Sequence, residues 1–164
     1  MELHINKHQK ALENLAHICQ HSKEIFFQAS QQADNNKLKK VFYKYAEQRN
    51  NFKNELKAQI NDGIAINEKI GPLNVLNDLW MKVRTSFVDY KDDEKSILET
   101  IRSSEISILE AYDNELQGDI LETDLKHLLV NQRMEISKAY NELEKFYFKH
   151  FPSQDNLFKL NNKR

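Results

Sequence analysis

The sequence predicts an all-α fold in which four long helices form one bundle, with a long connection between the second and the third. The first observation is composition: 164 residues include only three glycines and two prolines, and 30% are charged, which is typical of helical proteins. The second is that apolar residues recur every three or four positions along four long stretches. The third is that the helix breakers fall at only a few places, which are Gly63, Gly71, Pro72, Gly118 and Pro152.

The first helix is predicted over residues 5–33 and the second from Leu38 to a C-cap at Gly63. Residues 33–37 form a short polar turn between them, which suits an antiparallel return. The seam of the first helix consists of Ile5, His8, Leu12, Leu15, Cys19, Ser22, Phe26 and Ala29. The inward face of the second consists of Leu38, Phe42, Tyr45, Arg49, Phe52 and Leu56.

The connection after Gly63 is the longest, and its pattern predicts an extra short amphipathic helix with Leu73, Leu76, Trp80, Val83 and Phe87 on one face. The third long helix is expected to begin near Asp92 or Asp93 and to run to Gln117. Its inward residues are Ile97, Ile101, Glu105, Ile108, Tyr112 and Leu116.

The fourth helix is expected to start at Asp119, which forms a capping-box pattern with Glu122. Pro152 ends it. Its inward face consists of Leu121, Leu125, Leu128, Gln132, Ile136, Ala139, Leu143 and Phe146. Residues 1–150 are therefore interpreted as one domain, followed by a polar tail at 151–164 that either docks on the bundle or stays disordered.

The lengths of the connections predict the topology. Two short turns make the first and second helices antiparallel, and likewise the third and fourth. A connection of about 30 residues that carries its own helix can travel the length of the bundle, which is the one-crossover arrangement of ferritin-like folds.

Composition also argues against several classes of function. The net charge is −1 and the basic residues are spread along the chain, so no nucleic-acid footprint is expected. The sequence contains no stretch of 18 apolar residues that could insert into a membrane, and its N-terminus has no hydrophobic signal region. A cytoplasmic protein is therefore expected. Cys19 is the single cysteine, which excludes an internal disulfide and a cysteine-rich zinc site.

Four segments carry a resemblance to a known family: LAHICQHSKEIFFQAS, LKKVFYKYAEQRNNFKNEL, LNDLWMKV and SSEISILEAYDNEL. Over roughly residues 9–147 the chain resembles a bacterial family of ferritin-like four-helix-bundle proteins of unknown function. The most specific element is Gln48-Arg49-x-x-Phe52 together with the inward Glu105. Asn77-Asp78 departs from the basic pair that is usual there. The resemblance implies the fold but no activity.

Glu105 raises the question of a metal, because a carboxylate on an apolar stripe must be paired, protonated or metal-bound. A ferritin-like di-iron centre needs a Glu from each of two helices and Glu-x-x-His from each of the other two. At the level of Glu105 the facing helices offer Cys19, Arg49 and Gln132 instead. No metal and no other cofactor is therefore expected, and Arg49 is predicted to pair with Glu105, because its planar guanidinium suits a carboxylate.

The predicted polar centre consists of Arg49, Glu105 and Gln132, with Cys19 or Tyr45 nearby. In the simplest interpretation this pair only sets the register and arrangement of the helices. Cys19 is interpreted as a small buried residue rather than a redox thiol.

Two further groups of residues have weaker functional interpretations. Glu13, His17, His21 and Glu24 follow one another at spacings of four, four and three on an expected solvated face, where the two histidines could also grip a divalent metal. Asp124-x-x-His127 lies off the apolar face of the fourth helix.

Aromatic residues crowd the end of the fourth helix. Phe146, Tyr147, Phe148 and Phe151 cannot all face one seam, so part of this group is expected on an outer surface, as a homodimer contact or a dock for the tail.

The sequence therefore favours a non-catalytic ferritin-like bundle that serves as a binding or stress-associated module. The alternative is a metal-dependent oxidoreductase, di-iron or di-manganese, or an iron-handling protein with an incomplete centre. A third possibility is an assembly subunit that works through its outer aromatic surface.

Overall fold

The structure is a computed structural model that describes residues 2–60, 94–118 and 121–152, with side chains from Gln9 onward. These residues form four helices and no strand. The helices are α1 (Glu2–Gln32), α2 (Asn36–Gln59), α4 (Glu94–Leu116) and α5 (Thr123–His150). The predicted all-α four-helix bundle is confirmed, whereas the extra short helix expected around Trp80 lies outside the described residues.

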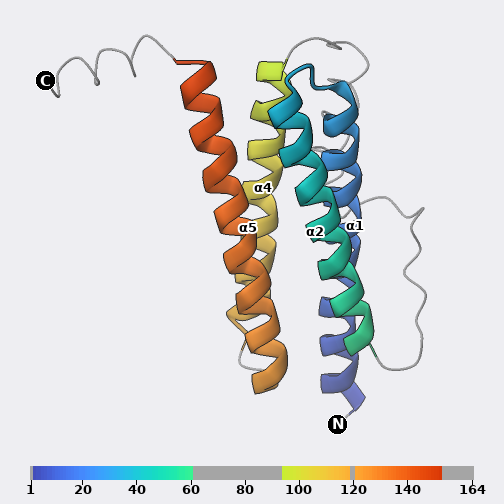
Figure 1. The fold of residues 1–164 in the computed structure, drawn as a ribbon. Helices are drawn as coiled ribbons and strands as arrows, with labels where there is room; N and C mark the ends of the chain where they lie inside the picture. The colour runs from blue at the N-terminus through green and yellow to red at the C-terminus, as the bar shows by residue number, and fades with distance from the viewer. Residues whose placement is uncertain (1, 61–93, 119–120, 153–164) are drawn as a thin grey trace, which may run out of the picture.

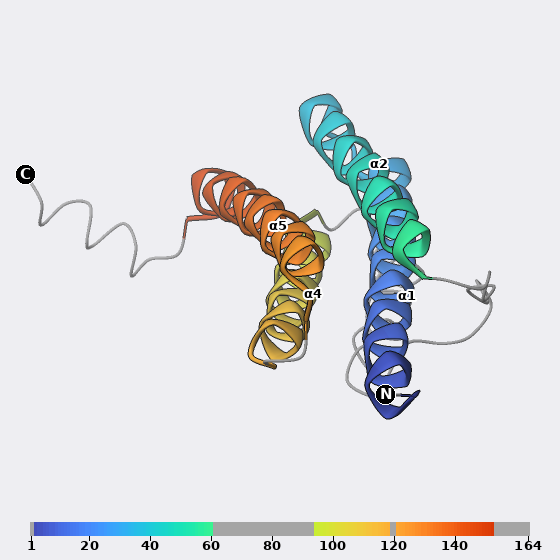
Figure 2. The same ribbon diagram turned by 90° about the horizontal axis from the view of Figure 1, so that it is seen from below.

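The four helices form two antiparallel pairs, α1 with α2 and α4 with α5 (Figures 1 and 2). In Figure 1, α1 runs upward from the N-terminus and α2 runs back down beside it. The start of α4 lies at the upper end, far from the end of α2, so α4 runs downward in the same direction as α2. The order of directions is therefore up, down, down, up.

The turn between α1 and α2 is capped and tied to α4. Asn35 is the N-cap of α2, and its side-chain oxygen accepts hydrogen bonds from the backbone N–H groups of Lys37 and Leu38, at 2.9 and 3.1 Å. The carboxylate of Glu94, in the first turn of α4, accepts from the backbone N–H groups of Asp34 and Asn35, both at 2.7 Å. Glu94 therefore fastens the start of one helix pair to the turn of the other.

The start of α5 differs from the prediction. The helix begins at Thr123, with Glu122 as an N-cap in extended backbone conformation and no side-chain capping hydrogen bond. The capping box with Asp119 as the N-cap is therefore wrong, because Glu122 lies outside the helix and cannot serve as its third residue. Asp124 in the first turn still places a negative charge at the positive end of the helix dipole.

The buried seam of α5 is also shorter than predicted. Leu121, Leu125 and Leu128 are only half-buried, and Leu129 is buried in their place. The continuous seam follows spacings of three and four and consists of Leu129, Gln132, Ile136, Ala139 and Leu143.

The apolar core divides into two clusters along the bundle axis. The cluster at the α1–α2 turn includes Phe26, Phe42 and Ile101, and the cluster toward the other end includes Leu15, Leu56 and Ile108. On α1, α2 and α4 the residues between the two clusters are polar and buried: Ser22, Arg49, Ser104 and Glu105. A polar layer therefore crosses the middle of the core.

Candidate functional site: a buried polar layer and an aromatic hollow

The polar layer is centred on an ion pair between α2 and α4. Arg49 Nη1 donates to Glu105 Oε1 at 2.8 Å, and Arg49 Nη2 donates to Glu105 Oε2 at 2.7 Å. The two side chains are 0% and 1% exposed. This parallel two-bond geometry is the strongest form of an arginine–carboxylate contact.

Arg49 also contacts residues other than Glu105. Nη1 also donates to Ser22 Oγ of α1 at 3.1 Å, and Nε donates to the side chain of Gln48 at 3.4 Å. The guanidinium carbon lies 5.3 Å from the centre of the Phe26 ring, within the range of a cation–π contact. The layer therefore joins α1, α2 and α4 through one side chain.

The electrostatics of the layer keep Arg49 charged. Burial by itself lowers the pKa of Arg49, but the charge and the hydrogen bonds of Glu105 outweigh it, so the pKa lies above its ordinary value. A buried guanidinium is tolerated because a carboxylate is paired with it at contact distance.

A second polar group lies one to two helical turns further along the bundle. Tyr112 OH donates to Gln132 Oε1 at 2.7 Å, and Cys19 Sγ lies 3.3 Å from the Tyr112 oxygen. Gln132 Nε2 donates to the backbone carbonyl of Phe52 at 3.4 Å and to Glu55 at 3.2 Å. Because the hydroxyl has one hydrogen and donates it to Gln132, the Cys19 thiol donates to Tyr112.

Gln132 does not have the partners that the sequence suggested. It bonds to Tyr112, Phe52 and Glu55 rather than to Arg49 or Glu105. The reason is helix register, since Arg102 contacts Glu144 and Tyr147 contacts Glu99 across the same pair of helices.

From these pairs and from Tyr112 with Gln132, we infer that Glu105 of α4 lies level with residues 139–141 of α5, of which Ala139 is the buried one. α5 begins at Thr123 rather than at Asp119. The residue of α5 that lies level with the ion pair comes later in the chain than Gln132. Ala139 is fully buried and has no polar side chain, so α5 adds nothing to the Arg49 layer.

Cys19 and Tyr112 of this group are uncharged at neutral pH. Burial raises the pKa of the Cys19 thiol to about 11, against a smaller lowering effect of the Arg49 charge. Burial likewise raises the pKa of Tyr112 well above its usual value. Since a thiolate is the reactive form of cysteine, this Cys19 thiol is unreactive in the folded protein.

The donor set of this centre does not fit a di-iron site. Of the central positions on α1, α2, α4 and α5, only Glu105 is a carboxylate, and a permanent cation already occupies its two oxygens. Across the described ranges, no three His, Cys, Asp or Glu side chains gather in a way that could hold a metal. Any metal at Glu105 would have to displace Arg49, which would then be left buried without a counter-charge.

His17 and His21 of α1 lie in a different environment from the one predicted. His21 is 8% exposed and His17 is half-buried, so the expected solvated face is wrong. On the same part of the bundle Lys53 is buried and donates to Gln20 at 2.7 Å. Burial and the neighbouring His21 lower the pKa of His17, while Glu13 raises it.

Three other residues singled out from the sequence lie apart from the polar layer. Tyr45 is buried, but its hydroxyl donates to Glu142 of α5, which also accepts from Lys44 at 3.4 Å. Burial and the Glu142 hydrogen bond raise the pKa of Tyr45. Asp124 and His127 are both exposed at the start of α5.

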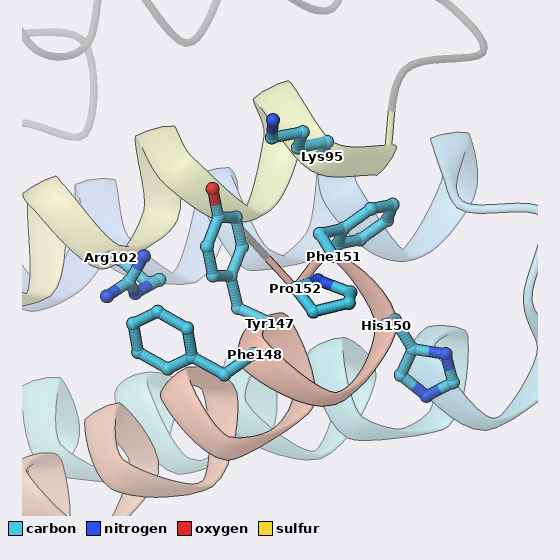
Figure 3. Close-up of a pocket in the computed structure, with 7 residues that line it drawn as sticks. All are labelled: Lys95, Arg102, Tyr147, Phe148, His150, Phe151 and Pro152. Carbon is cyan, nitrogen blue, oxygen red and sulfur yellow. The ribbon is translucent and has the colours of Figure 1, made fainter. Parts of the chain in front are cut away.

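The aromatic end of α5 lines a hollow between α4 and α5 (Figure 3). Phe148 is 43% exposed, whereas Phe146, Tyr147 and Phe151 are half-buried and pack against the core. Phe148 therefore confirms the expectation that part of this aromatic group lies on an outer surface. The homodimer contact proposed for it stays a prediction.

These observations define the class of the protein as an all-α four-helix bundle with a charged pair at the centre of its core. The chain belongs to the family described as a domain of unknown function (DUF2383), whose sequence model matches residues 7–118. The match covers α4 as well as most of α1 and all of α2, and so includes Ser22, Arg49 and Glu105.

Comparison with curated proteins and with solved structures finds no match. Among the described helices, none is long and apolar enough to cross a membrane.

Proposed function

We propose that this protein is a non-catalytic ferritin-like bundle, a cytoplasmic binding or stress-associated module in which an Arg49–Glu105 pair replaces the di-iron centre. The observation that carries the proposal is the two-bond contact of Arg49 with Glu105 at 2.7 and 2.8 Å, with both side chains buried. A charged group held in this way stabilises an arrangement of helices and offers no free oxygen for chemistry.

The topology supports the ferritin-like part of the proposal. An up, down, down, up order of helices needs one long connection, here between α2 and α4, as in ferritin-like folds. The sequence resemblance to a ferritin-like family of unknown function points the same way.

The chemistry of the core supports a non-catalytic role. Glu105 and Arg49 neutralise each other, and Cys19 and Tyr112 both keep their protons at neutral pH. An acid–base or nucleophilic reaction needs a group that can give up or accept a proton near the working pH and that a substrate can reach. The ion pair is buried out of a substrate's reach, and Arg49 stays charged.

Metal analysis tests this proposal against its alternative. The purified full chain is incubated anaerobically with Fe²⁺ or with Mn²⁺, passed through a desalting column and analysed for bound metal. We expect far less than one ion per chain, whereas about two ions per chain, the content of a di-iron or di-manganese bundle, would overturn the proposal. That result would favour the metal-dependent oxidoreductase or iron-handling protein.

A matched variant locates any metal that does bind. In Glu105→Gln the side chain keeps its size and loses its charge, so metal held at the bundle centre would be lost. Metal that binds equally to this variant and to the wild type lies elsewhere, and leaves the ion pair as proposed.

A further inference from the structure

A hollow of about 600 Å³ lies where the first turns of α4 meet the last turn of α5 (Figure 3). These helix ends lie at the end of the bundle opposite to the N-terminus (Figure 1). Its volume falls within the range of small-molecule sites. The described residues that line it are Lys95, Arg102, Tyr147, Phe148, His150, Phe151 and Pro152.

The hollow is basic. Apart from Tyr147, every titratable side chain among its described lining residues is a base: Lys95, Arg102 and His150. Lys95 is exposed and lies two helical turns before Arg102 on α4, so the two cations flank one side of the hollow. A ligand that carries a negative charge would therefore meet favourable charges here.

Arg102 is held in place rather than free to move. Its Nη2 donates to Glu144 at 2.9 Å, and its guanidinium carbon lies 4.4 and 5.0 Å from the ring centres of Tyr147 and Phe148. Its Nε is buried and has no hydrogen-bond partner within the described part of the chain. A guanidinium fixed in this way loses little conformational entropy when a ligand binds.

The nearest carboxylates hold the walls of the hollow instead of lining it. Glu99 accepts a hydrogen bond from Tyr147 OH at 2.7 Å, and Glu144 accepts from Arg102 and from Tyr140 OH. The Glu99 hydrogen bond raises the pKa of Tyr147, so this hydroxyl stays protonated as a donor. The acids therefore set the positions of Tyr147 and Arg102.

The remaining walls are aromatic. The Tyr147 ring lies 5.4 Å from Phe148 in an edge-to-face arrangement and 5.9 Å from Phe151 in a tilted one. Phe148 is 43% exposed, in contrast to Phe26 and Phe42, which are buried in the core. An aromatic ring that is kept half in solvent beside cations offers a surface on which a flat ligand can stack.

We propose that this hollow binds a small aromatic carboxylate, with its flat ring against Phe148 and Phe151 and its carboxylate toward Lys95 and Arg102. The assignment gives the proposed binding role a ligand class and rests on that role. The ion pair and the hollow are tested by different measurements, so one can fail while the other stands.

The test is a titration of the full chain with 2-naphthoate, in which NMR signals of the ligand and of the protein report binding. We expect saturable binding that weakens about two- to fivefold in Lys95→Gln, the effect of losing one exposed ion pair. Phe148→Ala should weaken it about three- to tenfold through the lost ring contact. Both substituted residues are exposed, so the variants should keep the helical content of the wild type.

Matched controls separate the site from general charge and apolarity. Lys126→Gln removes one exposed lysine near the start of α5, and Met134→Ala removes an exposed apolar side chain from the same helix. Neither should change the affinity. The uncharged naphthalene-2-carboxamide and the non-aromatic cyclohexanecarboxylate should each bind at least threefold more weakly than 2-naphthoate.

Three results would overturn the proposal. The first is binding that does not saturate, or that is the same in Lys95→Gln and Lys126→Gln. The second is equal affinity for 2-naphthoate and its carboxamide, which would make the hollow merely apolar. The third is a shift from dimer to monomer in the sedimentation of a Phe148→Ala, Phe151→Ala variant, which would show that a second copy of the chain covers this surface.

Discussion

Arg49 is the largest fully buried side chain in the described core, and its charge is neutralised by one partner. Replacing such a pair by apolar residues is often neutral, whereas removing one partner leaves an unpaired buried charge. Removing Glu105 alone should therefore lower the free energy of unfolding more than replacing Arg49 and Glu105 together by apolar residues.

Glu105→Ala should lower the free energy of unfolding by about 3–5 kcal/mol, because it leaves the Arg49 guanidinium buried without its carboxylate. Chemical denaturation monitored by circular dichroism measures this. Glu110→Ala, an exposed glutamate on the same helix, is the control and should change stability by less than about 0.5 kcal/mol. An unchanged melting temperature in Glu105→Ala would contradict the role given to the pair.

Cys19 should make stability depend on pH in the alkaline range. The pKa of its thiol is raised from 9.0 to about 11 in the folded protein, so the folded state holds this proton more tightly than the unfolded state. The resulting stabilisation is complete below pH 9 and is lost as pH rises toward 11, by about 2 kcal/mol.

The measurement is denaturant unfolding of wild type and Cys19→Ala between pH 8 and pH 11. The wild type should lose more stability than the variant over that interval. Equal slopes would show that the thiol does not titrate as the geometry requires.

Among the helices, the buried faces follow the sequence pattern more closely than the helix ends do. The seams of α1, α2 and α4 follow the predicted spacing of three and four. The Asn35 cap begins α2 inside the predicted polar turn, at Asn36 rather than at Leu38, and α2 ends at Gln59 with Ile60 as its C-cap rather than at Gly63. The start of α5 was predicted wrongly, because the Asp119–Glu122 spacing resembles a capping box while the helix begins at Thr123. Local capping patterns are frequent in polar turns and do not by themselves decide where a helix starts.

Asn35→Ala should lower the free energy of unfolding by about 1 kcal/mol, since it removes the acceptor for two backbone N–H groups at the start of α2. Thermal unfolding measures the effect. Asn36→Ala, at the next position on the exposed surface, is the matched control and should be nearly neutral. Equal losses in both variants would mean that the cap contributes nothing specific.

At the scale of the molecule, polar side chains connect the two helix pairs. Arg49 and Glu105 join α2 to α4, Glu94 joins α4 to the α1–α2 turn, and Gln132 joins α5 to both Tyr112 and α2. Directional bonds of this kind set which helix pairs meet and at what height. We infer that they specify the arrangement more than they add to its stability.

Gln132→Met keeps the volume of the side chain but removes its hydrogen bonds to Tyr112, Phe52 and Glu55. We expect a loss of about 1–3 kcal/mol, because the buried Tyr112 hydroxyl loses its acceptor. Denaturant unfolding gives the value, and Asn131→Met, on the exposed side of α5, controls for helix propensity. A loss no larger than in Asn131→Met would rule out this link between the pairs.

Apolar periodicity follows the pitch of the helix, so the amino-acid sequence was enough to predict the helical class, the faces of the helices and the residues that lie inward. It also singled out Arg49 and Glu105 as inward charges. It did not assign Gln132 to Tyr112, place Ser22 beside Arg49 or bury His21. Those contacts depend on how far each helix is displaced along its neighbour.

That displacement is set by packing between the helices, and a shift of one turn moves a side chain by about 5 Å and changes all of its partners. The hollow between Lys95 and Phe148 arises in the same way, since α4 and α5 bring the two residues together from more than fifty positions apart. Apolar periodicity indicates which side of a helix is buried, so the core residues could be predicted. The position of one helix along its neighbour depends on packing between the helices, so the hydrogen-bond partners could not.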